Sequence, residues 1–175
     1  MSEIGSLAGE GVVVRATGEA ACAELRPVRS RIPSLYADPL AWLVVDAVED
    51  ALSTCSDELY EARDDVAVIL ISPLCTLLTM EAVARAAPGG RVSPLRFAGA
   101  SPGGGGSLTC VARGFRGPSL TLATHPDRGL PVARTLVRSW LRSGQAAYAV
   151  VSAHEATAEG GHRVRCGVLA PEPGR

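Results

Sequence analysis

Residues 117–153 read GPSLTLATHPDRGLPVARTLVRSWLRSGQAAYAVVSA, and this stretch decides the fold class. Residues 119–123 alternate in polarity as a strand does, and residues 129–143 form the apolar stripe of a long amphipathic helix that Gly144 ends. The apolar run at 146–153 has the length and composition of a buried strand. A strand, a crossover helix and a second strand in this order predict two parallel strands of one sheet.

The other elements follow from the same patterns on either side of this unit. Asp38 and Pro39 are the N-cap and first residue of a helix, and the run VAVILI is a strand buried on both faces. The expected strands are 11–16, 66–71 and 163–169, the expected helices are 39–54, 74–87 and 107–113, and the expected loops are 17–33 and 89–106. We therefore predict an α/β fold in the order β-α-β-α-β-α-β-β, with helices on both faces of a mixed sheet whose last strand turns back at Glu159.

Composition limits the class of protein. The chain has 175 residues, of which 47% are hydrophobic and 20% charged, so we expect a single domain over residues 1–175 with its core at about 10–170. The 17 basic residues are all arginine and are balanced by 18 acidic ones, which argues against a partner bound by bulk charge, such as a nucleic acid or an anionic membrane. The absence of lysine excludes Schiff-base chemistry.

Location and cofactors follow from what the sequence lacks. No run of apolar residues is long enough to cross a membrane, and the first residues do not have the pattern of a signal peptide. The five cysteines, Cys22, Cys55, Cys75, Cys110 and Cys166, have no metal-ligand spacing. We expect no metal and no cofactor, a cytoplasmic location and reduced thiols, with Cys75 and Cys110 as small buried hydrophobic residues.

A few polar residues stand where an α/β protein places ligands. His125 and Asp127 lie in the turn between a strand and the long helix, and Glu155 follows His154 at the end of the next strand. Adjacent residues of a strand point to opposite faces, so His154 and Glu155 should not form a dyad. The glycine-rich segment before residue 107 is not a P-loop, because that motif needs a lysine. We expect these polar residues of strand ends to have no catalytic role; if the chain is an enzyme, His125, Asp127 and Glu155 are the catalytic candidates.

The order of these pieces resembles the nucleophile segment of the β-ketoacyl synthases, a thiolase-like family. In that family a Gly-Pro is followed by a strand, by Thr-Ala-Cys, by a long helix, and by a further glycine, strand and Gly-Gly-x-Glu end. The matching positions here are Gly117, Pro118, Thr124, Gly129, Leu130, Gly144, residues 146–152 and Glu155. The resemblance covers about residues 10–170, is strongest over 94–169, and implies the N-terminal half of the thiolase-like fold.

The resemblance fails at the nucleophile. Counted from Gly117, the family's cysteine falls at position 126, which is Pro126 here. Proline has no nucleophilic side chain, and the family's second half, which supplies two histidines, has no counterpart. The resemblance thus implies a subunit that does not condense acyl groups, similar to a truncated chain length factor that assists a type II polyketide or fatty-acid synthase.

Partners are also implied by the resemblance. In the family, the strand before the nucleophile pairs across a dimer axis, and its residues here are Ser119, Leu120, Thr121, Leu122 and Ala123. We expect a homodimer, or a heterodimer with a ketosynthase, and a half-domain should also expose an apolar face that a partner covers. Arg134, Arg138 and Arg142 form a stripe that either meets an acidic acyl carrier protein or is a solvated helix face. The alternatives are a stand-alone acyl-thioester enzyme and an acyl-ligand binding module, both using the His125–Asp127 turn.

Overall fold

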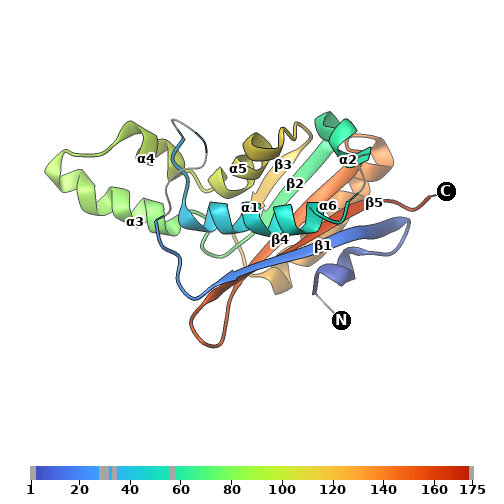
Figure 1. Ribbon diagram of the computed structural model, residues 1–175, viewed down its shortest axis with the longest axis horizontal. Helices are drawn as coiled ribbons and strands as arrows, with labels where there is room; N and C mark the ends of the chain where they lie inside the picture. Colours follow the sequence, from blue (N-terminus) through green and yellow to red (C-terminus); the bar gives the residue numbers. More distant parts are fainter. Residues whose placement is uncertain (1–2, 28–31, 33–34, 56–57, 174–175) are drawn as a thin grey trace.

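The computed structural model describes residues 3–27, 32, 35–55 and 58–173 and has the predicted α/β class (Figure 1). The strands are β1 (Val12–Cys22), β2 (Val66–Ile71), β3 (Ser119–Leu122), β4 (Tyr148–Ala156) and β5 (His162–Pro171). The α-helices are α1 (Pro39–Leu52), α2 (Glu58–Glu61), α3 (Leu77–Ala86), α4 (Pro94–Gly99), α5 (Gly104–Arg113) and α6 (Pro126–Ser143). Three 3-10 turns, η1 (Glu3–Leu7), η2 (Arg63–Asp65) and η3 (Ala87–Gly89), complete the described elements.

One mixed sheet holds the strands in the order β1-β5-β4-β2-β3. β2 runs parallel to both β3 and β4, whereas β5 runs antiparallel to β4 and to β1. This confirms the expected parallel core and the turn back into the last strand. In the described part of the chain β3 pairs only with β2, so its other side is an open edge.

Helices cover both faces of the sheet because its central strands are apolar on both. Val68 and Leu70 belong to the cluster under α1, while Ile69 and Ile71 belong to the cluster under α6 and η1. The approach of α1 to β1 depends on Gly18, where a Cβ atom would lie 2.8 Å from Cα of Ala51. The Asp38 N-cap prediction is confirmed, since Oδ1 of Asp38 accepts the amide of Leu40 at 2.9 Å.

The first strand is longer than its β-branched run suggests. We expected a strand at 11–16 and a loop at 17–33, but β1 continues to Cys22. Its second half pairs with β5 residue by residue, from Thr17 with Gly167 to Cys22 with His162. This pairing outweighs the low strand propensity of Gly18 and the alanines. Residues 28–31 and 33–34 of the expected loop lie outside the described residues.

The glycine-rich segment is also more ordered than its composition suggests. Residues 89–106 were expected to be a loop, but they contain α4 and the first turn of α5. Gly105 and Gly106 are buried in α5 because the helix runs close to the sheet: a Cβ atom at Gly105 would overlap the side chain of Leu70. The contact with the sheet outweighs the low helix propensity of glycine.

Some element boundaries differ from the expected ones. α3 begins at Leu77 instead of 74, because the hydroxyl of Ser72 accepts the amides of Leu74 and Cys75 and turns the chain first. α6 begins at Pro126, three residues before the expected start. β4 extends to Ala156, so His154 lies inside the strand and not at its end. The short α2 was not expected from the sequence.

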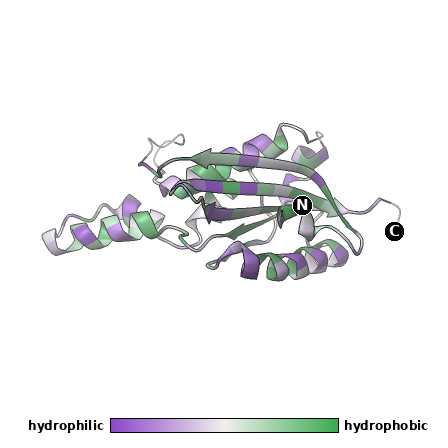
Figure 2. Cartoon of the chain, turned by 90° about the horizontal axis from the view of Figure 1, so that it is seen from below, coloured by the Kyte–Doolittle hydropathy of each residue, from purple (hydrophilic) through white to green (hydrophobic). Residues whose placement is uncertain are grey.

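One segment extends beyond the sheet. α3 and α4 form an arm that stands clear of the strands in the views of Figures 1 and 2. Several large apolar side chains on this arm are exposed, with Phe97 at 69%, Leu95 at 53% and Met80 at 44%. Within the described residues, no helix is long and apolar enough to cross a membrane.

Candidate functional site

The carboxyl ends of β2, β3 and β4 meet at one edge of the sheet, where α/β proteins commonly bind ligands. Ser72 follows β2, the 124–127 turn follows β3, and His154 lies near the end of β4. In the parallel register Ile71 is opposite Leu122 on one side and Ala153 on the other, so the next positions along the three strands are neighbours. This edge is the candidate site.

The turn after β3 places Pro126, the position that the resemblance aligns with the family's nucleophile, at a helix start. Pro126 is the first residue of α6 and is buried, whereas His125 and Asp127 on either side are exposed. The carbonyl of His125 accepts the amides of Arg128 and Gly129, at 3.1 and 3.0 Å. A helix start is where a thiolate would be stabilised, but position 126 holds a pyrrolidine ring with neither a nucleophile nor an amide proton.

His154 is the most constrained polar residue of this edge. Its side chain is fully buried; Nδ1 lies 3.0 Å from Oγ of Ser72, and Nε2 lies 3.1 Å from Nδ1 of His162. The Ser72 hydroxyl already accepts two backbone amides, which use both of its lone pairs, so its proton is donated to His154. His154 therefore carries its own proton on Nε2 and donates it to His162.

Burial, followed by the influence of His162, lowers the pKa of His154 to about 4. The imidazole is thus uncharged at neutral pH and is a weak base. Its hydrogen bonds and burial make it a structural tie between β2, β4 and β5. The sequence analysis singled out His154 but not its link to Ser72 and His162, for which the only signal is a serine that directly follows a buried strand.

Glu155 points away from His154. Oε1 of Glu155 lies 2.7 Å from Nη1 of Arg165, and Nε of Arg165 lies 3.1 Å from Oε2 of Glu19 on β1. Arg163 also contacts Glu19, with Nε 3.1 Å from Oε1. The carboxylate of Glu155 is therefore part of a row of ion pairs across β4, β5 and β1, separate from the His125–Asp127 turn.

Neither Cys75 nor Cys110 is activated. Cys75 lies in the turn between β2 and α3 with a φ of 48°, and its Sγ atom donates to the carbonyl of Ser72 at 3.2 Å. Burial, and secondly the charge of Asp38, raises the pKa of the Cys75 thiol. Burial likewise raises the pKa of the Cys110 thiol, despite a hydrogen bond to Ser119. Neither environment favours a thiolate.

The open edge of β3 is available for pairing. Ser119, Leu120 and Ala123 are exposed, while Thr121 and Leu122 are half-buried. The carbonyl of Leu122 accepts the amide of Ser72, so the even-numbered positions point their backbone groups at β2. Backbone groups alternate in direction along a strand, and those of Ser119, Thr121 and Ala123 therefore point to the open edge.

The arginine stripe of α6 is largely occupied. Nη1 of Arg138 lies 2.6 Å from a carboxylate oxygen of Glu10, and Arg142 donates to the Glu10 carbonyl at 3.2 Å. Arg134 lies 3.9 Å from the same carboxylate. Glu10 is in a turn with positive φ at Gly9, Glu10 and Gly11, so the stripe holds this turn against α6. It is thus neither a free binding surface nor a simple solvated face.

No group of three or more His, Cys, Asp or Glu side chains in the described ranges is arranged to hold a metal ion. The His154–His162 pair stands apart from further ligands of these types within the same ranges.

Several solved structures share this architecture, although no family model and no curated protein matches the sequence. Among solved structures, the ishigamide ketosynthase/chain length factor is similar at 16% identity with a TM-score of 0.71, over 94% of this chain and 63% of that chain. A ketosynthase in complex with its chain length factor from Xenorhabdus doucetiae gives 16% identity and a TM-score of 0.61, over 95% of this chain and 81% of that one.

A third similar structure is a type II polyketide ketosynthase bound to a hexaketide, in complex with its acyl-carrier protein. It gives 13% identity and a TM-score of 0.64, over 92% of this chain and 62% of that chain. The chain thus has the thiolase-like fold of ketosynthases and chain length factors. It spans less than two thirds of the first of these structures.

Proposed function

We propose that this chain is a non-catalytic ketosynthase-like subunit that assists a type II polyketide or fatty-acid synthase by pairing with an active ketosynthase. The observation that carries the proposal is Pro126, buried at the helix start where the family's cysteine would lie. The likeness to structures that contain chain length factors supports it. We take the chain to act as one domain in the cytoplasm, where its five free thiols would stay reduced.

The proposed pairing surface is the edge of β3, formed by Ser119, Leu120, Thr121, Leu122 and Ala123. A β-strand with an open edge pairs readily with a strand of another chain. The outer face of α6 offers less because it is mostly polar. Val132 is exposed on it, but so are Asp127, Arg128, Thr135, Ser139 and Arg142. A half-domain is also expected to have an apolar face, but the mostly polar character of this helix face leaves β3 as the proposed interface.

An acyl carrier protein remains a second proposed partner. One similar structure contains an acyl-carrier protein bound to its ketosynthase, which supports this idea for the present chain. The row of Arg134, Arg138 and Arg142 does not, because Glu10 and two backbone carbonyls already engage it. The carrier protein would therefore contact the partner ketosynthase or another surface of this chain.

The experiment is a co-purification with the host's ketosynthase, followed by light scattering. Thr121→Pro removes one amide proton from the open edge and leaves the bonds to β2 in place, whereas Thr121→Val keeps that proton. We expect a discrete complex or a homodimer with the wild type and with Thr121→Val, and its loss with Thr121→Pro. Circular dichroism checks that both variants fold. A wild-type chain that stays monomeric with the ketosynthase present would overturn the proposal.

The alternative is an acyl-thioester enzyme or acyl-binding module at the His125–Asp127 turn. It is tested by hydrolysis of an acyl thioester by the wild type and by His125→Ala. Turnover that depends on His125 would favour it over the subunit.

A further inference from the structure

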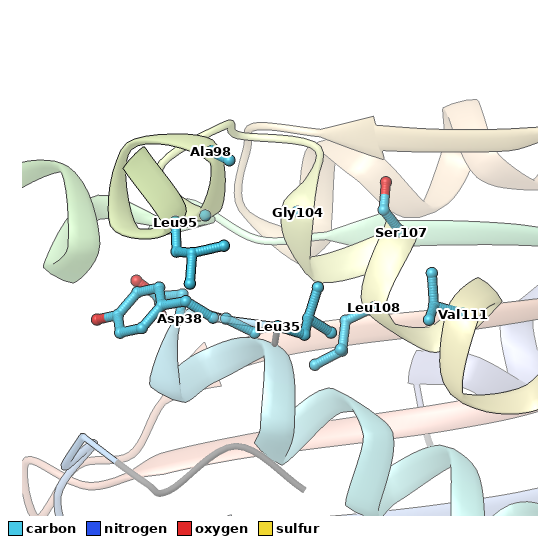
Figure 3. Close-up of a pocket in the computed structure, with 11 residues that line it drawn as sticks. Leu35, Asp38, Leu95, Ala98, Gly104, Ser107, Leu108 and Val111 are labelled. Carbon is cyan, nitrogen blue, oxygen red and sulfur yellow. The ribbon is translucent and has the colours of Figure 1, made fainter. Parts of the chain in front are cut away.

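An apolar cavity lies between residues 35–38, α4 and α5 (Figure 3). It is open to solvent and has a volume of about 180 Å³. An apolar cavity of about 150 Å³ is large enough to bind benzene. Its size therefore suits one small ligand.

Aliphatic side chains from three segments form its walls. Leu35 comes from the segment before α1, Leu95 from α4, and Leu108 and Val111 from α5. Leu108 is buried, whereas Leu95 and Val111 are 53% and 60% exposed and form the mouth. Exposed apolar side chains around a cavity lose unfavourable contact with water when an apolar group enters.

The carboxylate of Asp38, which lines the cavity, is already hydrogen-bonded within the protein. Asp38 is buried, and its carboxylate accepts the amides of Leu40 and Thr79, each at 2.9 Å, and the Thr79 hydroxyl at 2.8 Å. These bonds tie α1 to α3 and leave a negative group that disfavours an anionic ligand.

The one aromatic ring is occupied as well. The guanidinium of Arg96 lies 5.5 Å from the centre of the Tyr36 ring, over its face. Because Arg96 covers this face of the ring, the cavity favours an aliphatic ligand over an aromatic ligand that would stack on Tyr36.

From this lining we propose that the cavity binds an unbranched aliphatic chain whose neutral polar end stays at the mouth between Leu95 and Val111. The chain contacts the leucine and valine side chains, and the binding free energy comes from removing apolar surface from water. This inference is independent of the pairing at β3.

The test is a titration with 1-butanol, 1-hexanol and 1-octanol, observed through leucine and valine methyl resonances by NMR. We expect shifts at Leu35, Leu95, Leu108 and Val111, with a Kd that tightens about fourfold for each added methylene. Leu95→Asp places a charge at the mouth and should weaken octanol binding by about tenfold or more. Phe97→Asp is the matched control, because Phe97 is on the same helix and more exposed but does not line the cavity.

Three results of the titration would overturn the proposal, as would a fourth observed before any alcohol is added. The first is an absence of shifts at the lining methyl groups, and the second is a Kd that does not change with chain length. The third is an equal loss of binding in Phe97→Asp and Leu95→Asp, which indicates general adsorption to the arm. If the cavity instead receives a side chain from a second copy, the same methyl groups will shift with protein concentration before any alcohol is added, and this also contradicts the proposal.

Discussion

His154 and His162 are joined by a hydrogen bond of 3.1 Å, and their rings stack with centres 5.4 Å apart and planes 22° from parallel. One imidazole lies in β4 and the other at the start of β5. Together with Ser72 they connect three strands at the end of the sheet. The energetic consequence is that the folded chain resists a proton on His154.

The stability of the protein should therefore fall on mild acidification. The pKa of His154 is about 4 in the folded state, against 6.5 for an ordinary histidine, so the unfolded chain takes up a proton first. Stability is fully present above pH 6.5 and is lost as the pH falls towards 4, by up to about 3 kcal/mol. Urea unfolding at several pH values measures this. His154→Gln should flatten the profile, and His125→Gln, at an exposed site, should leave it unchanged.

Arg138 should contribute more to stability than its neighbour on the same helix face. Its side chain is only 14% exposed and contacts both the carboxylate of Glu10 and the carbonyl of Gly9. Arg138→Ala should cost about 1–2 kcal/mol of unfolding free energy. Arg134→Ala removes a longer, more exposed contact and should cost less than about 0.5 kcal/mol. Equal losses in urea unfolding would contradict the assignment of Arg138 as the residue that holds the Glu10 turn.

A methyl group at Gly18 should separate α1 from β1. A Cβ atom there would overlap the backbone of Ala47 and Ala51, which cannot move independently of the helix. We expect Gly18→Ala to lower the unfolding free energy by about 3 kcal/mol or more. At Gly103 a Cβ atom meets nothing within 4 Å, so Gly103→Ala is the control and should change stability little. Thermal unfolding compares the two variants, and a Gly18→Ala melting temperature like that of the wild type would show that α1 shifts freely.

Cys166 should be the least reactive thiol. It is fully buried in β5, and burial raises its pKa to about 12 in spite of a hydrogen bond to Ser152. Cys22 and Cys55 are only half-buried, although burial raises the pKa of both thiols. At pH 8, iodoacetamide should modify these two before Cys166, which should react only when the chain unfolds. Mass spectrometry of the labelled peptides gives the order, and early labelling of Cys166 would contradict this packing.

The element boundaries that depend on apolar periodicity were predicted from the sequence. The boundaries that depend on contacts between distant segments were not. The β2 boundaries and the Asp38 cap follow from local patterns and are confirmed. β1 beyond Ala16 was missed because its partner lies about 150 residues away and its own residues favour no strand. α5 was placed too late because Gly105 packs against Leu70, a contact that no local rule contains.

The candidate site was predicted in part. His125, Pro126 and Asp127 lie in the turn where the strand–helix pattern puts them, and their functional roles remain predictions. The link from Ser72 to His154 and His162 could not be read from the sequence, because it needs the register of β2 beside β4. Glu10 as the partner of the α6 arginines was missed for a similar reason: more than 120 residues separate them.

β5 is the last strand along the chain, yet it lies between β1 and β4 in the sheet. During synthesis β1 emerges first, but its only partner among the described strands is made last. The open side of β4 also stays without a partner until then. Because such distant pairing is slow, the sheet should close only once β5 has left the ribosome, and the chain should be most prone to aggregate while the edges of β1 and β4 are unpaired.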